Sequence, residues 1–303
     1  MIDFLTAITP LIIIHTIAMI ALIASSYTDL KRREVPDWIS IGLVCLGIFV
    51  NLLFSILFWD YNYILGSLVG FAAVLLLGWI MFYSGQWGGG DSKMLMALGA
   101  LLGINPFVHE IPWFAHFIFN LIIVGAVYGL LWTVYLIISK FNAFSRSLQD
   151  LLKERRLRQA KATMFFVLLL LILMGVLIMI VPQLRQFSFM SGFILYIALV
   201  VPLTFYLWIA VKAVEKSCML KFVLPGQLTE GDWIAKDIVV KGKTIASPKD
   251  LGIDKKQIAI LKKLYTRGLI KKILIKEGIP FLPSFLIAYA LTVAMGNILF
   301  YFI

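Results

Sequence analysis

Residues 64–103, "ILGSLVGFAAVLLLGWIMFYSGQWGGGDSKMLMALGALLG", contain an apolar run, a loop with three consecutive glycines and an aspartate, and a second apolar run. The first run is close to the roughly 20 residues that a helix needs to cross a bilayer. Of the 303 residues in the chain, 61% are hydrophobic and 14% are charged. The sequence therefore predicts an all-α polytopic membrane protein, in which Asp91 stands at the edge of an apolar segment.

Apolar runs of similar length recur along the rest of the chain. A shorter run, Ser92–Ile104, is long enough for only about half of a bilayer unless it extends through Asn105 and Pro106, so it could be re-entrant or tilted. Counting it as a crossing gives about eight transmembrane helices. The N-terminus has no basic segment before its apolar run, so we interpret that run as a retained span and not a signal peptide. The other predicted spans are Ile8–Tyr27, Ile39–Phe58, Ile64–Phe82, Trp113–Ile138, Ala162–Val181, Phe193–Val211 and Phe281–Ile303.

The basic residues indicate an orientation in the membrane. If the spans alternate and the N-terminus lies outside, 26 of the 27 Lys and Arg residues fall on one side, with Arg185 as the exception. Because Lys and Arg concentrate in cytoplasmic loops, that side is predicted to face the cytoplasm of a multi-pass protein of the cell membrane. The net charge of +11 then reflects this bias and contact with anionic membrane lipid, and we predict no nucleic-acid partner.

The chain is expected to have three parts. Residues 1–212 form a transmembrane core, residues 213–280 form a small cytoplasmic α+β domain, and residues 281–303 form a C-terminal transmembrane helix. Within the core, the basic stretch 140–161 has leucines near helical spacing. This pattern predicts a helix on the inner membrane surface or, as an alternative, a solvated basic linker.

The small domain shows signals for both strands and helices. The segment "WIAKDIVVKGKTIAS" reads as a hairpin that turns at Gly242, and "LIKKILIKEG" reads as a further strand. Between them, "DKKQIAILKKLYTRG" reads as a helix capped by Asp254 and ended by Gly268. The domain contains no acidic pair beside a glycine-rich loop, so we expect it to be dispensable for chemistry.

Two aspartates mark a candidate catalytic site. Asp29 is the first charge after the first apolar run, and the predicted topology places it at the same membrane face as Asp91. Two carboxyl groups that share a proton titrate as a pair, so one stays protonated while the other accepts a proton from water. Such a pair can hydrolyse an amide without a metal. Because a helix N-terminus favours negative charge, we expect Asp91 to be the more acidic member.

The glycines before Asp91 fit such a site. Gly88, Gly89 and Gly90 have no side chains, so the backbone can bend sharply and an extended substrate can approach it closely. The alternative is that Asp91 simply caps a helix after a flexible loop. The loop lacks the spacing of a phosphate-binding glycine motif.

These motifs resemble those of a known family. "GGGDSKMLMALG", with Lys93 and Gly99, is similar to the GxGD motif of type IV prepilin peptidases and archaeal preflagellin peptidases. "TDLKRREVPDW" resembles the first motif of that family, and residues 213–280 resemble the C-terminal domain of its archaeal members. The resemblance implies an aspartic endopeptidase that removes short basic leader peptides from pilin or archaellin precursors, with Asp29 and Asp91 as the catalytic residues.

Two other functions remain as alternatives. A presenilin-like or signal-peptide-peptidase-like intramembrane protease also uses a GxGD aspartate, but the "YD" and "PAL" motifs of those enzymes do not occur in this sequence. A non-catalytic transporter or assembly scaffold could use the same aspartates to carry protons or organise loops.

No cofactor or metal site is predicted. The paired CxxC motifs of the bacterial enzymes of this family do not occur in the sequence, so we expect neither a methyltransferase activity nor zinc. His109, Glu110 and His116 do not have the HExxH spacing, and the predicted topology places them at the face opposite the aspartates.

Overall fold

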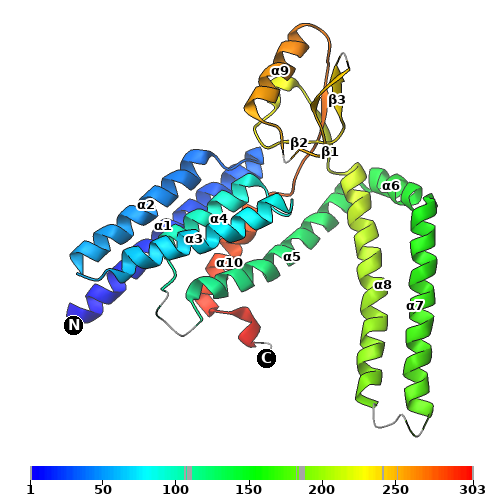
Figure 1. Ribbon diagram of the computed structural model, residues 1–303, viewed down its shortest axis with the longest axis horizontal. Helices are drawn as coiled ribbons and strands as arrows, with labels where there is room; N and C mark the ends of the chain where they lie inside the picture. Colours follow the sequence, from blue (N-terminus) through cyan, green and yellow to red (C-terminus); the bar gives the residue numbers. More distant parts are fainter. Residues whose placement is uncertain are drawn as a thin grey trace. The chain divides into compact units, whose positions relative to one another are not determined.

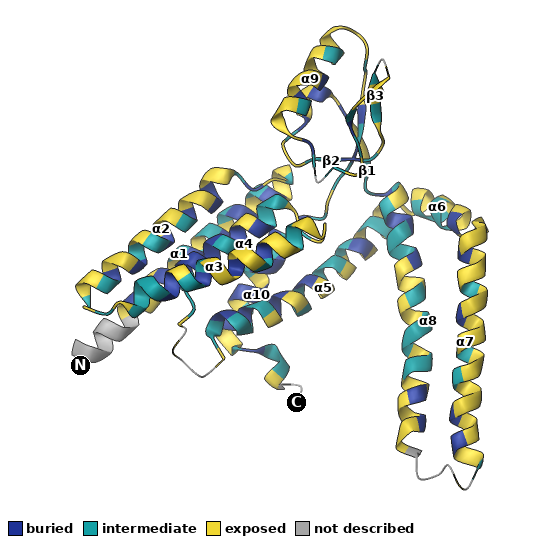
Figure 2. Cartoon of the chain, in the orientation of Figure 1, coloured by how far each residue is buried: buried dark blue, intermediate teal, exposed yellow. Residues whose placement is uncertain are grey.

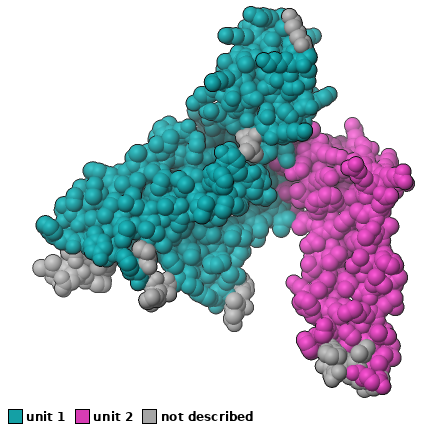
Figure 3. Space-filling model, viewed as in Figure 1, with its two compact units in different colours: residues 1–132, 222–303 teal, residues 133–221 magenta. Residues whose placement is uncertain are grey.

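A computed structural model describes residues 2–105, 107, 111–181, 183, 188–240, 242–250 and 252–301. The chain is mostly helical, with a small sheet-containing region near its C-terminus (Figure 1). The chain divides into two compact units. Residues 1–132 and 222–303 form one unit, and residues 133–221 form the other (Figure 3). This division differs from the predicted boundaries at residues 212 and 280, which stay predictions.

Six helices are long and apolar enough to cross a membrane, so the chain is a multi-pass membrane protein. Their outward faces carry many exposed leucine, isoleucine and phenylalanine side chains, as lipid-facing surfaces do (Figure 2). The six helices are α1 (Ile2–Arg32), α2 (Asp37–Leu57), α3 (Asn62–Tyr83), α5 (Trp113–Ser139), α7 (Arg155–Ile180) and α8 (Ser188–Ser217).

Two of the expected crossings are shorter than a full span. These are α4 (Gly89–Leu102) and α10 (Leu282–Met295), each with 14 residues. At 1.5 Å per residue each helix covers only about 21 Å, less than the roughly 30 Å of the hydrocarbon core. The predicted count of about eight full spans is therefore reduced to six long helices and two short ones.

The short helix α4 runs antiparallel to α3 along most of its length. Gly78 of α3 lies beside Ser92 and Met96, whereas Gly66, near the start of α3, accepts a hydrogen bond from Ile104 N at 2.8 Å. The two ends of α4 therefore lie near opposite ends of α3.

Glycines allow α4 to approach α3 closely. A Cβ atom added at Gly99 would lie 2.7 Å from Gly70 O, so neither glycine can be replaced without moving a helix. Small residues at helix contacts let backbones approach in this way in membrane proteins. The side chains of α4 are largely buried as a result, with Met94, Leu95 and Leu98 fully inaccessible.

Side chains of neighbouring helices cap the C-terminal ends of both short helices. Asn51 of α2 donates to Leu101 O of α4 at 3.0 Å, and Ser67 of α3 donates to Ala100 O at 2.6 Å. Asn120 of α5 donates to Gly296 O, just after α10, at 2.7 Å. Carbonyl groups at a helix end need such partners where lipid excludes water.

The helix α10 runs antiparallel to α1. Leu282, at the start of α10, contacts the C-terminal part of α1 through a hydrogen bond from Ser26 Oγ to Leu282 O at 3.1 Å. Further along α10, Tyr289 Oη lies 2.6 Å from His15 Nδ1 in the middle of α1. His15 therefore makes a hydrogen bond between helices, the usual role of a histidine within a span.

The second unit contains α6 (Phe141–Lys153) between the end of α5 and the start of α7. The apolar residues of α6, Phe144, Leu148 and Leu151, pack against α8 at Phe205, Ile209 and Ala213. The basic stretch 140–161 is therefore helical, with a break at Glu154, and it is not a linker. Its apolar side contacts protein, which the prediction of a membrane-surface helix did not include.

The small α+β region has its own core. Its strands are β1 (Leu220–Val223), β2 (Trp233–Ile234), β3 (Ile238–Val240), β4 (Lys243–Ala246) and β5 (Ile273–Lys276), arranged as a sheet of order β1-β5-β2 and a hairpin of β3 and β4. The helix α9 (Lys255–Thr266) packs on them through Ile258 and Leu261.

Several local predictions for this region are confirmed. Gly242 has a φ of +77° between β3 and β4, and Asp254 Oδ1 accepts from Gln257 N at 2.6 Å as the N-cap of α9. Residues 233–234 instead form β2, which pairs with β5, so the predicted hairpin begins later than expected. The helix α8 continues to Ser217, so residues 213–217 are helical.

Candidate active site

The Asp29 carboxylate lies buried near the C-terminal end of α1. Its side chain is 7% exposed, and its Oδ2 accepts a hydrogen bond from the backbone N–H of Leu282 at 2.9 Å. Leu282 is the first residue of α10, and its N–H has no partner within that helix. The carboxylate of one helix therefore satisfies the free N-terminal donor of another.

The Asp91 carboxyl group lies in the first turn of α4, at the same end of the helices as Asp29. Its Oδ2 accepts a hydrogen bond at 3.2 Å from the backbone N–H of Gly88, the N-cap residue of the same helix. The helix-capping alternative is thus part of the geometry. It does not account for the second charge nearby, because Asp29 acts electrostatically on Asp91.

Burial and the charge of Asp29 together raise the pKa of Asp91 to about 7, while the hydrogen bond from Gly88 acts in the opposite direction. Loss of hydration and repulsion from a second carboxylate thus outweigh a helix-terminus effect that is worth at most about 2 kcal/mol. Which of the two aspartates is the more acidic member of the pair stays a prediction.

The three glycines have different surroundings. A Cβ atom at Gly90 would lie 3.2 Å from Val35 Cβ, in the loop between α1 and α2, and one at Gly88 would lie 3.3 Å from Asp91 Oδ2. A Cβ atom at Gly89 would make an ordinary contact of 3.6 Å with Phe82. Gly90 thus faces the protein, which differs from the open substrate strand expected over Gly88–Gly90.

Lys93 lies one turn after the glycines and contacts α2. Its Nζ is 2.6 Å from Oδ1 of Asp37, the first residue of α2, and both side chains are about half exposed. The ion pair joins the N-terminal ends of α2 and α4. A role of Lys93 in the site stays a prediction.

Residues that the motifs did not indicate surround Asp29. Tyr128 of α5 is electrostatically coupled to Asp29 and Arg33, and its buried Oη has no hydrogen-bond partner among the described residues. The Arg33 guanidinium lies 4.9 Å from the ring centroid of Trp132, and its Nη1 donates to Gly278 O at 3.5 Å. Pro283, a helix-start signal in "GIPFLPSF", could have indicated that α10 begins at this end.

Trp87, just before the glycines, also reaches the start of α10. Its ring centroid lies 6.1 Å from that of Phe281 and 5.6 Å from that of Phe285. The loop that carries Asp91 and the helix end that carries Asp29 thus both contact the first turn of α10. This turn connects the two predicted catalytic segments.

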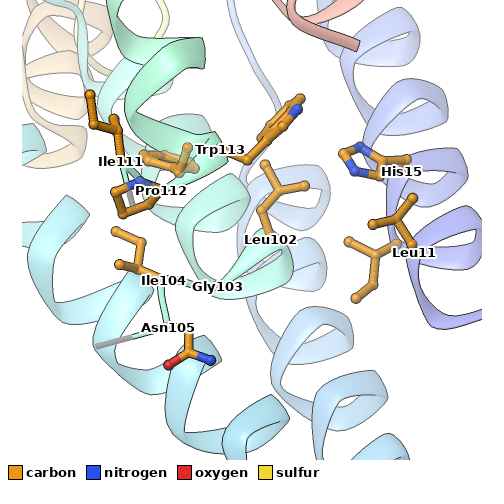
Figure 4. Close-up of a pocket in the computed structure, with 11 residues that line it drawn as sticks. Leu11, His15, Leu102, Gly103, Ile104, Asn105, Ile111, Pro112 and Trp113 are labelled. Atoms are coloured by element: carbon orange, nitrogen blue, oxygen red, sulfur yellow. The ribbon is translucent and has the colours of Figure 1, made fainter. Parts of the chain in front are cut away.

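Two cavities lie at the other end of α4. One, of about 360 Å³, is lined by residues that include Leu11, His15, Leu102 and Trp113 (Figure 4). The other, of about 390 Å³, adjoins Asn51, Asn62 and Gly66. Neither cavity is lined by Asp29 or Asp91, so the candidate site is separate from both.

No cluster of three or more potential metal ligands occurs among the described residues. His116 lies with its ring 5.9 Å from that of Phe300. His109 and Glu110 lie outside the described residues, so the absence of a metal site at "HEIPWFAH" stays a prediction.

The fold and these residues define a multi-pass helical membrane protein with two carboxyl groups at one end of its bundle. Residues 16–130, which include Asp29 and Asp91, match the type IV leader peptidase family. The resemblance seen in the sequence motifs is thereby confirmed.

Curated relatives agree with this match. The chain is 41% identical to the preflagellin peptidase of Methanococcus maripaludis over 88 residues, which are 29% of this chain and 38% of the relative. It is 40% identical to the preflagellin peptidase of Methanocaldococcus jannaschii over 86 residues, 28% of this chain and 36% of the relative. These alignments span less than two fifths of either relative.

A longer alignment has lower identity. The prepilin peptidase EppA of Methanothermobacter thermautotrophicus is 22% identical to this chain, and the alignment covers 93% of the chain and 94% of the relative. Similarity to a protein of this name therefore extends beyond residues 16–130, which match the family.

Proposed function

We propose that this protein is a membrane-embedded aspartic endopeptidase that removes short basic leader peptides from prepilin or preflagellin precursors. The observation that carries the proposal is the placement of two carboxyl groups, Asp29 at the end of α1 and Asp91 in the first turn of α4, at the same end of these helices, where the charge of Asp29 helps to raise the pKa of Asp91. A protonated and an ionised carboxyl group can then coexist near neutral pH. The names of the relatives support leader peptides of pilins or archaellins as substrates.

The chemistry follows from this proton arrangement. The ionised carboxylate takes a proton from water while the water oxygen attacks the carbonyl carbon, and the protonated carboxyl group gives its proton to the carbonyl oxygen. When the tetrahedral intermediate collapses, the C–N bond breaks. The carboxyl group that took a proton from water gives this proton to the leaving nitrogen. The other carboxyl group recovers a proton from the intermediate. The pair returns to its starting state, and no metal takes part.

The position of the pair suits a particular substrate. We place Asp29 and Asp91 at the cytoplasmic membrane face, because 26 of the 27 basic residues fall on that side in the predicted topology. A site there meets the junction between a basic leader and an apolar helix. It does so without drawing unpaired backbone groups into the hydrocarbon core, where they are costly. Gly88–Gly90 and Lys93 shape the loop beside the pair.

The test uses purified protein in liposomes with a membrane-embedded precursor that carries a basic leader. Asp29→Asn and Asp91→Asn should each reduce cleavage by at least about 100-fold, the low end of general acid–base contributions. Asp60→Asn is a matched control, because Asp60 accepts from Asn62 N at 2.9 Å in the turn before α3 and an asparagine can keep that bond. Cleavage at the wild-type rate by both site variants would exclude an aspartic peptidase.

The product separates the two alternatives. Mass spectrometry of the released peptide should place the cut at the end of the basic leader. A cut within the apolar segment would favour a presenilin-like protease. A wild-type protein that cleaves no precursor, together with a solute flux that depends on the aspartates, would favour a transporter.

A further inference from the structure

The first turn of α10 is anchored to α1 at two atoms of one residue. Leu282 N donates to Asp29 Oδ2 at 2.9 Å, and Leu282 O accepts from Ser26 Oγ at 3.1 Å. All three residues are buried, with Leu282 fully inaccessible. A hydrogen bond in such surroundings is little weakened by competing water, so the contact fixes the carboxylate in one orientation.

The local sequence leaves this N–H available for Asp29. Pro283, the second residue of α10, has no N–H, and Ser284 N already donates to Phe281 O at 3.0 Å. Phe281 cannot supply a side-chain cap. Leu282 N–H is therefore a free donor at the positive end of the helix, beside the N–H of Phe281, which also acts on Asp29, and a negatively charged acceptor suits it best.

Leu282 is distant from the family motifs in sequence. It follows Asp29 by 253 residues and lies outside the matched segment 16–130. Four residues, 277–280, separate β5 of the α+β region from Phe281, the N-cap of α10. The matched segment therefore contains both aspartates but not everything that holds Asp29.

We propose that the N-terminus of α10 is a positioning element of the active site, in which the Leu282 amide holds Asp29 as the ionised member of the pair. This inference rests on the proposed peptidase function. It assigns the roles that the function alone leaves open: Asp29 accepts the proton of the attacking water, and Asp91 donates a proton to the substrate carbonyl. A chain cut off after the second motif lacks this element.

Four other groups act on Asp29 and bear on a test by pH. Arg33 follows directly after α1, the backbone N–H of Phe281 is a second hydrogen-bond donor to Asp29, and Asp91 of α4 and Tyr128 of α5 interact with Asp29 electrostatically. The variants that test the proposal leave all four in place. A change in the acidic limb of the pH–rate profile can then be assigned to the lost donor.

The experiment compares Leu282→Pro with Leu282→Ala in the precursor-cleavage assay from pH 4 to pH 9. Proline is accepted at the first position of a helix but has no N–H, whereas alanine keeps the N–H and loses only the side chain. Leu282→Pro should move the acidic limb up by about one to two pH units, or about 10- to 100-fold in rate at the lower pH, since a hydrogen bond to a charged group is lost. Leu282→Ala should keep the wild-type limb despite a lower melting temperature.

Identical pH profiles for the two variants would overturn the proposal. If Leu282→Pro does not accumulate in membranes, Ser26→Ala decides, because it loosens Leu282 without removing the N–H. An upward shift of the acidic limb in Ser26→Ala supports the proposal, and an unchanged limb contradicts it. Asp29→Asn, measured in parallel, tests the peptidase function separately. It should be inactive whether or not Leu282 positions Asp29, so an active Asp29→Asn variant would contradict the peptidase function itself.

Discussion

The first turn of α4 and the first turn of α10 each donate a hydrogen bond to one of the two aspartates, but they do so in different ways. Asp91 accepts from Gly88, three residues before it, so a short piece of sequence forms the contact. Asp29 accepts from Leu282, 253 residues after it, so the contact exists only in the folded chain. One carboxyl group is held by its own helix, and the other depends on the packing of α1 against α10.

The largest expected effect concerns the α4 turn. Gly90→Val should reduce cleavage by about 10- to 100-fold, because a side chain there meets Val35 and overpacking costs about 1–3 kcal/mol. Gly89→Ala is the control, since its added atom makes an ordinary contact with Phe82. Cleavage assays on liposomes measure both variants.

A second change tells packing from substrate exclusion. Val35→Ala makes room beside residue 90, so the double variant Val35→Ala/Gly90→Val should recover most of the activity. If the double variant stays as inactive as Gly90→Val, the substrate contacts the backbone at Gly90, as the sequence predicts.

The far ends of the two short helices extend the comparison. Asn51→Leu and Asn120→Leu should each lower the free energy of unfolding by about 1–3 kcal/mol, because each leaves buried carbonyl groups without a donor. Thermal unfolding in detergent measures both. Wild-type stability in either variant would mean that its short helix does not need the side-chain cap.

Stability should also depend on pH through Asp91. Its pKa of about 7 in the folded protein exceeds the ordinary value of 3.8, so the folded state binds more protons between these values. The free energy of unfolding therefore falls as pH rises from about 4 to about 7. Asp91→Asn removes this loss and should be about 1–3 kcal/mol more stable than wild type at pH 8 but not at pH 4. If the free energies of unfolding of wild type and Asp91→Asn differ by the same amount at all pH values, the raised pKa is contradicted.

The smallest effect is expected at Lys93. Lys93→Gln should reduce cleavage less than about threefold, because a half-exposed ion pair contributes about 1 kcal/mol or less. Asp37→Asn should have the same effect, and the double variant should add little. A much larger loss in Lys93→Gln than in Asp37→Asn would show that Lys93 contacts the substrate directly.

Local sequence predicts part of this arrangement. Apolar length located the six long helices, and the cap at Asp254 could be read from the residues around it. The placement of Asp29 and Asp91 at one end follows from counting crossings. The two aspartates lie at one end although α4 is short, because α4 still runs from one end of α3 to the other.

Other features depend on packing between distant segments. The contact of Gly90 with Val35 and the donation from Leu282 to Asp29 require specific helix orientations, which apolar periodicity does not determine. The raised pKa of Asp91 depends on packing in the same way. Sequence shows its place at a helix N-terminus, but not its burial or its distance from a second charge.

A titration of Asp91 shows whether the two carboxyl groups are coupled. In protein labelled with ¹³C at aspartate carboxyl groups, the Asp91 signal, assigned with Asp91→Asn, should titrate near pH 7. In Asp29→Asn the same signal should titrate at lower pH, because the repelling charge is gone while burial remains. An Asp91 titration that is the same in wild type and in Asp29→Asn would show that the two groups do not act as a pair.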